Sequence, residues 1–197
     1  MSAVLELAPL KLRLDPAVRM NEDQFFEFCR QNRDIRIERS AEGDLFIMPP
    51  VGGHTGARES EIGFQLTAWA KQDKTGISFS ASTGFRLPNG ATRSPDAAWV
   101  RKERLLCLSP KQYEQFIVLC PDFLIELRSP SDNLDILLEK MQEYLANGAQ
   151  LGWLIDPIER RVWVFRPDSE PEIAANPESI AGSPLLPGFI LDLREIW

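Results

Sequence analysis

The apolar residues of this chain recur at two spacings, and the wider spacing predicts helices. Ile62, Leu66 and Trp69 lie three or four residues apart, so they share one side of a helix that we expect over residues 56–71. The preceding run Pro49-Pro50-Val51-Gly52-Gly53 contains the residues that most often interrupt regular structure. The chain therefore enters its longest predicted helix from a loop.

Two further helices are predicted from the residues at their ends. Asn21 is a typical N-cap, and the phenylalanine-rich stretch that follows it ends before Asn32. A later helix is expected over residues 132–147, where Gly148 supplies the usual C-terminal residue. A helix-rich excursion around residues 113–116 separates two of the predicted strands.

Alternating or continuous apolar residues at the narrower spacing predict strands. Residues 123–128 form the most apolar of these runs, which is typical of a strand at the centre of a sheet. Residues 35–40 and 44–48 alternate on either side of Ala-Glu-Gly, which is a hairpin signal. The predicted strands are 10–14, 35–40, 44–48, 77–80, 84–87, 97–100, 123–128, 151–155, 161–166 and one near Ile173.

The order of these elements indicates the fold class. A hairpin, a helix, three strands, the central strand, a helix and a strand pair follow one another, which is typical of an α/β or α+β protein whose mixed β-sheet is flanked by helices. The N-terminal helix and β-hairpin precede this core. We find no interior linker, so we expect one domain over residues 21–197, preceded by an arm over residues 1–20.

Composition constrains the location and the chemistry of the protein. The chain has 197 residues, of which 44% are hydrophobic, and this is enough for one well-packed core. No apolar run reaches the roughly 18 residues of a membrane span, and the N-terminus lacks a basic region before an apolar one. We therefore expect a cytoplasmic protein with no membrane partner. Three widely spaced cysteines and the single His54 argue against a disulfide framework and a structural zinc site.

The net charge of −7 argues against tight non-specific binding of nucleic acid, which needs an excess of lysine and arginine. It does not argue against a nuclease, because catalytic carboxylates themselves add negative charge. Some arginines near the N-terminal helix and hairpin either contact phosphates or belong to a mixed-charge surface, since Asp34 and Glu38 are interleaved with them. These arginines are Arg30, Arg33, Arg36 and Arg39.

Two acidic residues stand in or beside apolar stretches. Asp96 follows Arg-Ser-Pro and precedes Ala-Ala-Trp-Val, and Glu126 lies within the predicted central strand. A buried carboxylate is costly unless it is paired, hydrogen-bonded or bound to a metal. On neighbouring strands, two carboxylates could hold a hard divalent cation such as Mg²⁺. The alternatives are a turn role for Asp96 and a structural ion pair from Glu126 to Arg128 or Arg93.

Several motifs, in the same order along the chain, resemble the Uma2 family of bacterial proteins, which is assigned to the PD-(D/E)XK restriction-endonuclease-like nuclease superfamily. With the C-terminal Leu-Pro-Gly-Phe, the resemblance covers roughly residues 25–195. The motifs are Ser-Thr-Gly-Phe-Arg-Leu-Pro-Asn-Gly (82–90), Arg-Ser-Pro-Asp-Ala-Ala-Trp-Val (93–100), Cys-Pro-Asp-Phe-Leu-Ile-Glu-Leu-Arg-Ser-Pro-Ser-Asp (120–132), Lys-Met-Gln-Glu-Tyr (140–144) and Asn-Gly-Ala-Gln-Leu-Gly-Trp-Leu-Ile-Asp-Pro (147–157).

The resemblance implies a set of site residues. The first acid of the superfamily corresponds to Asp96 and the second to Glu126. These two side chains would bind Mg²⁺, with Mn²⁺ as a substitute, together with the main-chain carbonyl of Leu127. Members of the superfamily often carry a further glutamate on the first core helix, for which Glu61 is our first candidate and Glu59 our second.

The chain departs from the superfamily pattern at one position. A lysine is expected two residues after the second acid, and this chain has Arg128, which keeps its proton and so stabilises charge without serving as a base. Lys140, on the following helix, matches a lysine of the family. We assign it the lysine role and keep Arg128 as a helper. The alternative is an exposed helix lysine paired with Glu143.

Together these residues predict a metal-dependent endonuclease that hydrolyses phosphodiester bonds in DNA. By analogy, two sites related by two-fold symmetry would cut the two strands of a duplex, so we expect a homodimer. The alternative is a catalytically impaired nuclease-fold module that binds nucleic acid or a protein partner, which Arg128 and the acidic balance favour. A third hypothesis, a structural partner protein, predicts carboxylates locked in salt bridges without an open cleft.

Overall fold

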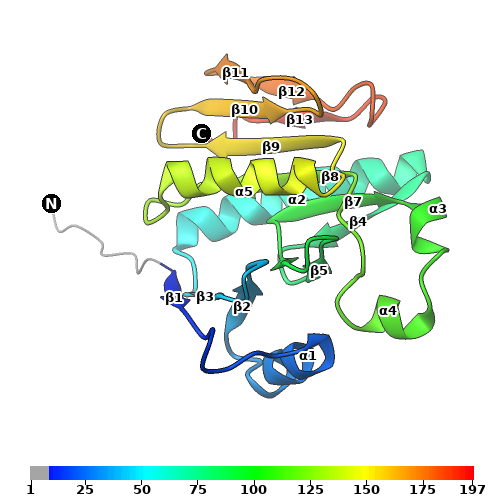
Figure 1. The fold of residues 1–197 in the computed structure, drawn as a ribbon. Coiled ribbons are helices and arrows are strands. Elements are labelled where there is room, and N and C mark those ends of the chain that lie inside the picture. The colour runs from blue at the N-terminus through cyan, green and yellow to red at the C-terminus, as the bar shows by residue number, and fades with distance from the viewer. Residues whose placement is uncertain (1–8) are drawn as a thin grey trace, which may run out of the picture.

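The computed structural model describes residues 9–197 and contains a large mixed sheet, as predicted (Figure 1). Its strand order is β11-β10-β9-β8-β7-β4, in which β8 and β9 are parallel and the other neighbours are antiparallel. The strands are β4 (Gly76–Ser80), β7 (Ala97–Arg101), β8 (Phe123–Leu127), β9 (Leu151–Asp156), β10 (Arg161–Phe165) and β11 (Glu172–Ala175).

A smaller sheet contains the predicted hairpin, with the order β1-β3-β2-β6-β5. A separate pair, β12 and β13, lies near the C-terminus. The sequence did not predict β6, β12 or β13, because strands of two or three residues are too short to show a period. The bounds are β1 (Leu10–Leu12), β2 (Arg36–Arg39), β3 (Leu45–Met48), β5 (Phe85–Arg86), β6 (Thr92–Arg93), β12 (Ser179–Ala181) and β13 (Ile190–Asp192).

The division into an arm and a domain stays a prediction. Residues 1–8 of the predicted arm lie outside the described residues, and β1 of the same arm pairs with β3. The helices are α1 (Glu22–Gln31), α2 (Gly53–Asp73), α3 (Lys102–Leu105), α4 (Pro110–Glu114) and α5 (Leu134–Ala146). Across residues 9–197, none of them has both the length and the apolar character of a membrane-crossing helix.

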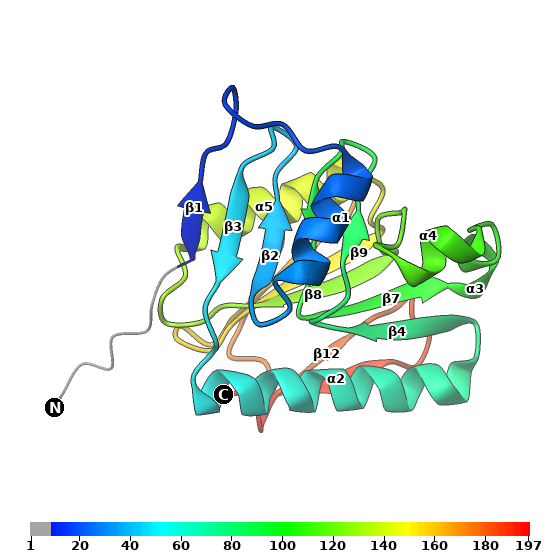
Figure 2. The same ribbon diagram turned by 90° about the horizontal axis from the view of Figure 1, so that it is seen from below.

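The helices α2 and α5 cover opposite faces of the large sheet (Figures 1 and 2). This follows from the alternation of side chains along β8. Phe123, Ile125 and Leu127 belong to the core cluster that contains the apolar side of α2, whereas Leu124 packs with α5. Glu126 is two residues from Leu124, so the only charged residue of β8 projects into the layer between the sheet and α5.

The helix α5 begins two residues later than predicted, because Asn133 is its N-cap. The Asn133 side-chain oxygen accepts from the backbone N–H of Asp135 at 2.8 Å and of Ile136 at 3.4 Å. Asp132 instead accepts from the backbone N–H of Ser129 at 2.8 Å, which closes the loop before the helix. The loop and the start of α5 are therefore fixed by two separate side chains.

The Asn133→Ala variant is expected to lower the free energy of unfolding by about 1 kcal/mol, because it leaves N-terminal amides of α5 without their acceptor. Urea denaturation at neutral pH measures this change. The control is Gln142→Ala on the exposed side of the same helix, which should stay within about 0.5 kcal/mol of the parent. Equal effects of the two substitutions would contradict the capping role.

Candidate active site

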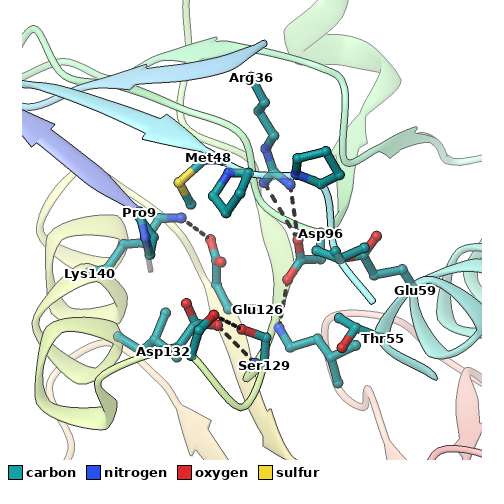
Figure 3. A pocket seen from close by; sticks show the side chains of 16 residues that line it. Pro9, Arg36, Met48, Thr55, Glu59, Asp96, Glu126, Ser129, Asp132 and Lys140 are labelled. Atoms are coloured by element: carbon teal, nitrogen blue, oxygen red, sulfur yellow. Dashed lines mark hydrogen bonds and ion pairs between the residues drawn. The ribbon is translucent and has the colours of Figure 1, made fainter. Parts of the chain in front are cut away.

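Some of the predicted site residues line one cavity of about 80 Å³, between the small sheet, β8 and the two main helices (Figure 3). Arg36 reaches into it from β2, and Thr55 and Glu59 reach it from α2. The volume has room for only a few water molecules or a hydrated ion. The predicted residues that line it are Asp96, Glu126, Leu127 and Lys140.

Asp96 lies directly before β7, and its side chain bonds to the backbone of the neighbouring strand β8. Its Oδ2 accepts from the backbone N–H of Leu127 at 2.7 Å, and its Oδ1 lies 3.5 Å from both terminal nitrogens of Arg36. Arg36 also donates to the carbonyl oxygen of Ser94. Burial raises the pKa of Asp96 above its usual value, against the opposing charge of Arg36. One carboxylate oxygen is thus fixed by the backbone, and the other faces a cation.

Glu126 is only 3% exposed and is held by two residues of α5. Its Oε1 accepts from the Tyr144 hydroxyl at 2.9 Å and lies 2.9 Å from the Lys140 ammonium nitrogen. Burial raises the pKa of Glu126 to about 7, although the charge of Lys140 acts in the opposite direction. The ion pair to Arg128 or Arg93 that we considered is not present among the described residues, because Lys140 is the partner.

Lys140 is buried rather than exposed on α5, and the alternative pair with Glu143 does not form because Glu143 bonds to Arg93 instead. Its ammonium nitrogen lies between two carboxylates, 2.9 Å from Glu126 and 3.0 Å from Glu38. Burial on its own would lower the pKa of Lys140, but the two carboxylates outweigh this effect and the pKa lies above its usual value. Lys140 is therefore a charged ammonium, which suits it to neutralise charge and not to accept a proton.

Glu38 of β2 belongs to the same cluster, although the sequence suggested only a mixed-charge surface. The side chain is almost fully buried, and its Oε1 accepts from the backbone N–H of Ser94 at 2.9 Å as well as from Lys140. Its Oε2 lies 3.4 Å from Arg93. A signal was present, since Arg36 and Glu38 are two residues apart and project from the same face of a predicted strand.

The structure does not bring Glu61 and Arg128 into this cluster. Glu61 accepts from the side chain of Gln65 at 2.9 Å, on the side of α2 that meets β13, and Glu59 lines the cavity in its place. Arg128 donates to Asp156 at 2.6 Å, at the end of β9. Its guanidinium therefore neutralises a buried structural carboxylate. Arg128 stands at the position of the superfamily lysine but does not line the cavity.

The donor set of the cavity fits a hard divalent cation. Asp96 and Glu126 offer carboxylate oxygens on neighbouring strands, and Leu127 lines the same cavity. Within residues 9–197, no three His, Cys, Asp or Glu side chains are grouped as a metal site. A cation here would thus complete its shell with main-chain and water oxygens, as Mg²⁺ commonly does. Burial raises the pKa of both acids, which means that the surrounding cations do not fully balance their negative charge. A bound cation would supply the missing positive charge.

In the absence of metal, stability is expected to fall as the pH rises from about 4.5 to about 7. The folded protein keeps a proton on Glu126, with its pKa of about 7, whereas the unfolded chain loses it near the usual 4.5. The folded state then binds more protons in this window, so the free energy of unfolding decreases, by at most about 3 kcal/mol. The pKa of Glu38 is lowered, so its stabilising effect is lost only at lower pH.

Urea denaturation in the presence of a chelator, at pH values from 5 to 8, measures this dependence. Glu126→Gln should make the decrease between pH 4.5 and 7 smaller, and the part that remains comes from other buried acids with a raised pKa, such as Asp96. A parent profile that is flat across the upper window would contradict the buried, protonated state of Glu126.

Comparisons with known proteins agree with this architecture. The model of the Uma2 family, described as "Putative restriction endonuclease", matches residues 22–194. A crystal structure described as a "putative nuclease belonging to DUF820 from Anabaena variabilis ATCC 29413" is 22% identical in sequence, with a TM-score of 0.68. The match covers 85% of this chain and 91% of that chain, and it shows a shared fold. No curated protein matches the chain.

Proposed function

The chain belongs to the Uma2 family, and from this premise we propose that it is a metal-dependent endonuclease that hydrolyses phosphodiester bonds in DNA. The observation that carries the proposal is the convergence of Asp96, Glu126 and Lys140 on one cavity. These residues come from the position directly before β7, from β8 and from α5, so the fold and not local sequence brings them together. Two acids can hold a metal ion that activates a water molecule, and a charged lysine can stabilise the negative charge that develops on a phosphate.

The residues of the chain have separate tasks in this proposal. Asp96 and Glu126, with the main chain of Leu127, would hold Mg²⁺ or Mn²⁺, which when bound polarises the phosphate and lowers the pKa of a water molecule. The Leu127 N–H orients Asp96 and the Tyr144 hydroxyl orients Glu126. Lys140 keeps its proton and stabilises the negative charge that develops on the phosphate.

The alternative is a catalytically impaired module that keeps the fold and binds nucleic acid or a protein partner. The ion pairs of Asp96 with Arg36 and of Glu126 with Lys140 favour it, because they partly neutralise both acids without a metal. Metal binding separates the two functions, since a binding module has no need of Mg²⁺ or Mn²⁺ at these carboxylates.

Cleavage of supercoiled plasmid and of linear DNA, in the presence of Mg²⁺ or Mn²⁺, tests the proposal. The parent should convert the plasmid to nicked and linear forms, and a chelator should stop the reaction. If the well-folded parent binds the metal and cleaves neither DNA, the binding module becomes the better description. Sedimentation equilibrium tests the homodimer, which we retain as part of the proposal by analogy with enzymes that cut both strands.

Glu38 should act as a positioning residue for Lys140, since it accepts from that ammonium group at 3.0 Å and is itself held by the Ser94 N–H. Glu38→Gln is expected to lower the cleavage rate about tenfold, which corresponds to roughly 1.4 kcal/mol. In a Lys140→Met background the same substitution should have little further effect on the rate. A double-mutant cycle of cleavage rates measures this coupling, and strictly additive effects would show that Glu38 only stabilises the fold.

A further inference from the structure

A second cavity adjoins the one that is lined by Asp96, Glu126 and Lys140. It has a volume of about 450 Å³ and lies between α5 and the small sheet, where β1, β2, β3 and β6 contribute to its walls. We call it the side groove. The side groove adjoins the first cavity, which we call the acid cavity, and some residues line both of them. The shared residues are Pro9, Met48, Ser131, Asp132, Leu137 and Lys140.

The side groove has an apolar surface inside a polar border. Phe46 and Met48 of β3 face Ile136 and Leu137 of α5 across it. Ile136 is 57% exposed and leaves apolar surface for a ligand inside the groove. Such a surface suits a flat group with apolar faces.

The charged residues of the side groove do not suit a phosphate. Its cations already have acidic partners: Arg93 with Glu143 at 2.6 Å, Lys140 with Glu38 at 3.0 Å, and Lys11 with Asp44 at 2.8 Å. Glu42 and Glu139 are exposed acids that also line the groove. A second phosphate would be repelled there, whereas a neutral group with polar edges would not.

We infer that the side groove holds the base of the nucleotide next to the scissile phosphate, and that the substrate is a single strand or a duplex from which that base is extruded. The inference rests on the proposed function, because Lys140 marks the junction between the phosphate position and the groove. The volume lies in the range of pockets for small ligands and can accept one nucleobase. A base in this groove has left its stack and its partner, as in enzymes that act on extruded bases.

The first test is cleavage of a labelled single-stranded oligonucleotide in which one abasic nucleotide is moved step by step through the cleavage position. At one position beside the cut, loss of the base should slow cleavage about tenfold or more, since stacking of a single base on a protein surface commonly has effects of this size. A perfectly paired duplex of the same sequence should be cut more slowly than the single strand.

Ile136→Ala removes apolar surface from the groove, and Ile173→Ala on β11 is its matched control. The two isoleucines are 57% and 58% exposed, and Ile173 does not line the groove. Ile136→Ala should slow cleavage of the intact strand and reduce the effect of the abasic nucleotide. Ile173→Ala should leave both quantities unchanged.

Separate outcomes distinguish failure of the inference from failure of the proposed function. Equal cleavage of intact and abasic strands at all positions, or equal cleavage of single and double strands, would overturn the inference alone. Absence of cleavage of every oligonucleotide by folded, metal-loaded protein would overturn the proposed function and the inference with it.

Discussion

Asp96→Asn is expected to abolish metal-dependent cleavage of DNA, with a decrease in rate of about 1,000-fold or more. The reason lies in the hydrogen bond from the Leu127 N–H to Asp96 Oδ2. An asparagine must turn its carbonyl oxygen toward this donor, so its NH₂ group faces Arg36 and the cavity. The position then presents a donor where a cation requires an acceptor. Plasmid cleavage and the binding of Mn²⁺, followed by electron paramagnetic resonance, should both be lost.

Asp122→Asn is the matched control for this variant. Asp122 is also a buried aspartate, 4% exposed, which accepts from the Arg101 N–H at 2.9 Å and pairs with Arg104 at 3.0 Å. It does not line the acid cavity. Asp122→Asn should therefore lower stability and leave cleavage and Mn²⁺ binding in place. Equal loss of cleavage in both variants would show that the effect of Asp96→Asn comes from the fold.

Lys140→Met is expected to lower the cleavage rate about 100- to 1,000-fold. The variant lacks the ammonium group that stabilises the negative charge on the phosphate in the transition state. The substitution also leaves Glu38 and Glu126 without their shared cation, so thermal unfolding must confirm that the variant is folded at the assay temperature. Single-turnover cleavage at saturating Mn²⁺ separates the effect on the chemical step from an effect on metal affinity.

Arg128→Met is the informative comparison, because Arg128 occupies the position where the superfamily has its lysine. Its guanidinium neutralises Asp156, which is fully buried at the end of β9. The variant should lose about 3 kcal/mol of stability and keep its cleavage rate within a few-fold of the parent. If instead Arg128→Met loses cleavage and Lys140→Met retains it, the lysine role belongs to Arg128.

The sequence predicted the large sheet well because its strands are long enough to show a pattern. Residues 123–127 are apolar except for Glu126, because β8 is covered on both faces, by α2 and by α5. The short strands β6, β12 and β13 carry no such pattern, and tertiary pairing defines them. The start of α5 was placed two residues early because Asp132 and Asn133 are both good capping residues.

Those site residues that short sequence motifs identify, Asp96, Glu126 and Lys140, were predicted, and all three line the cavity. The preference for Glu61 over Glu59 could have been reversed, since Glu59 is three residues before Ile62 and seven before Leu66, on the side of α2 that faces the sheet. The spacing of Arg36 and Glu38 indicated that they share one face of a strand, but it did not indicate which residues they meet. Their contacts depend on where the small sheet lies relative to α5, and no local spacing encodes that placement.

The contact between Glu38 and Lys140 joins residues that are 102 positions apart, and the contact between Arg36 and Asp96 spans 60. Contacts of such long range form late, because the intervening chain must be ordered before they offset its entropy. A chain that leaves the ribosome carries both acids before it carries the lysine. It completes the charge cluster only when α5 has docked and met the small sheet. On refolding, recovery of the proposed cleavage activity is therefore expected to follow the docking of α5 against the small sheet.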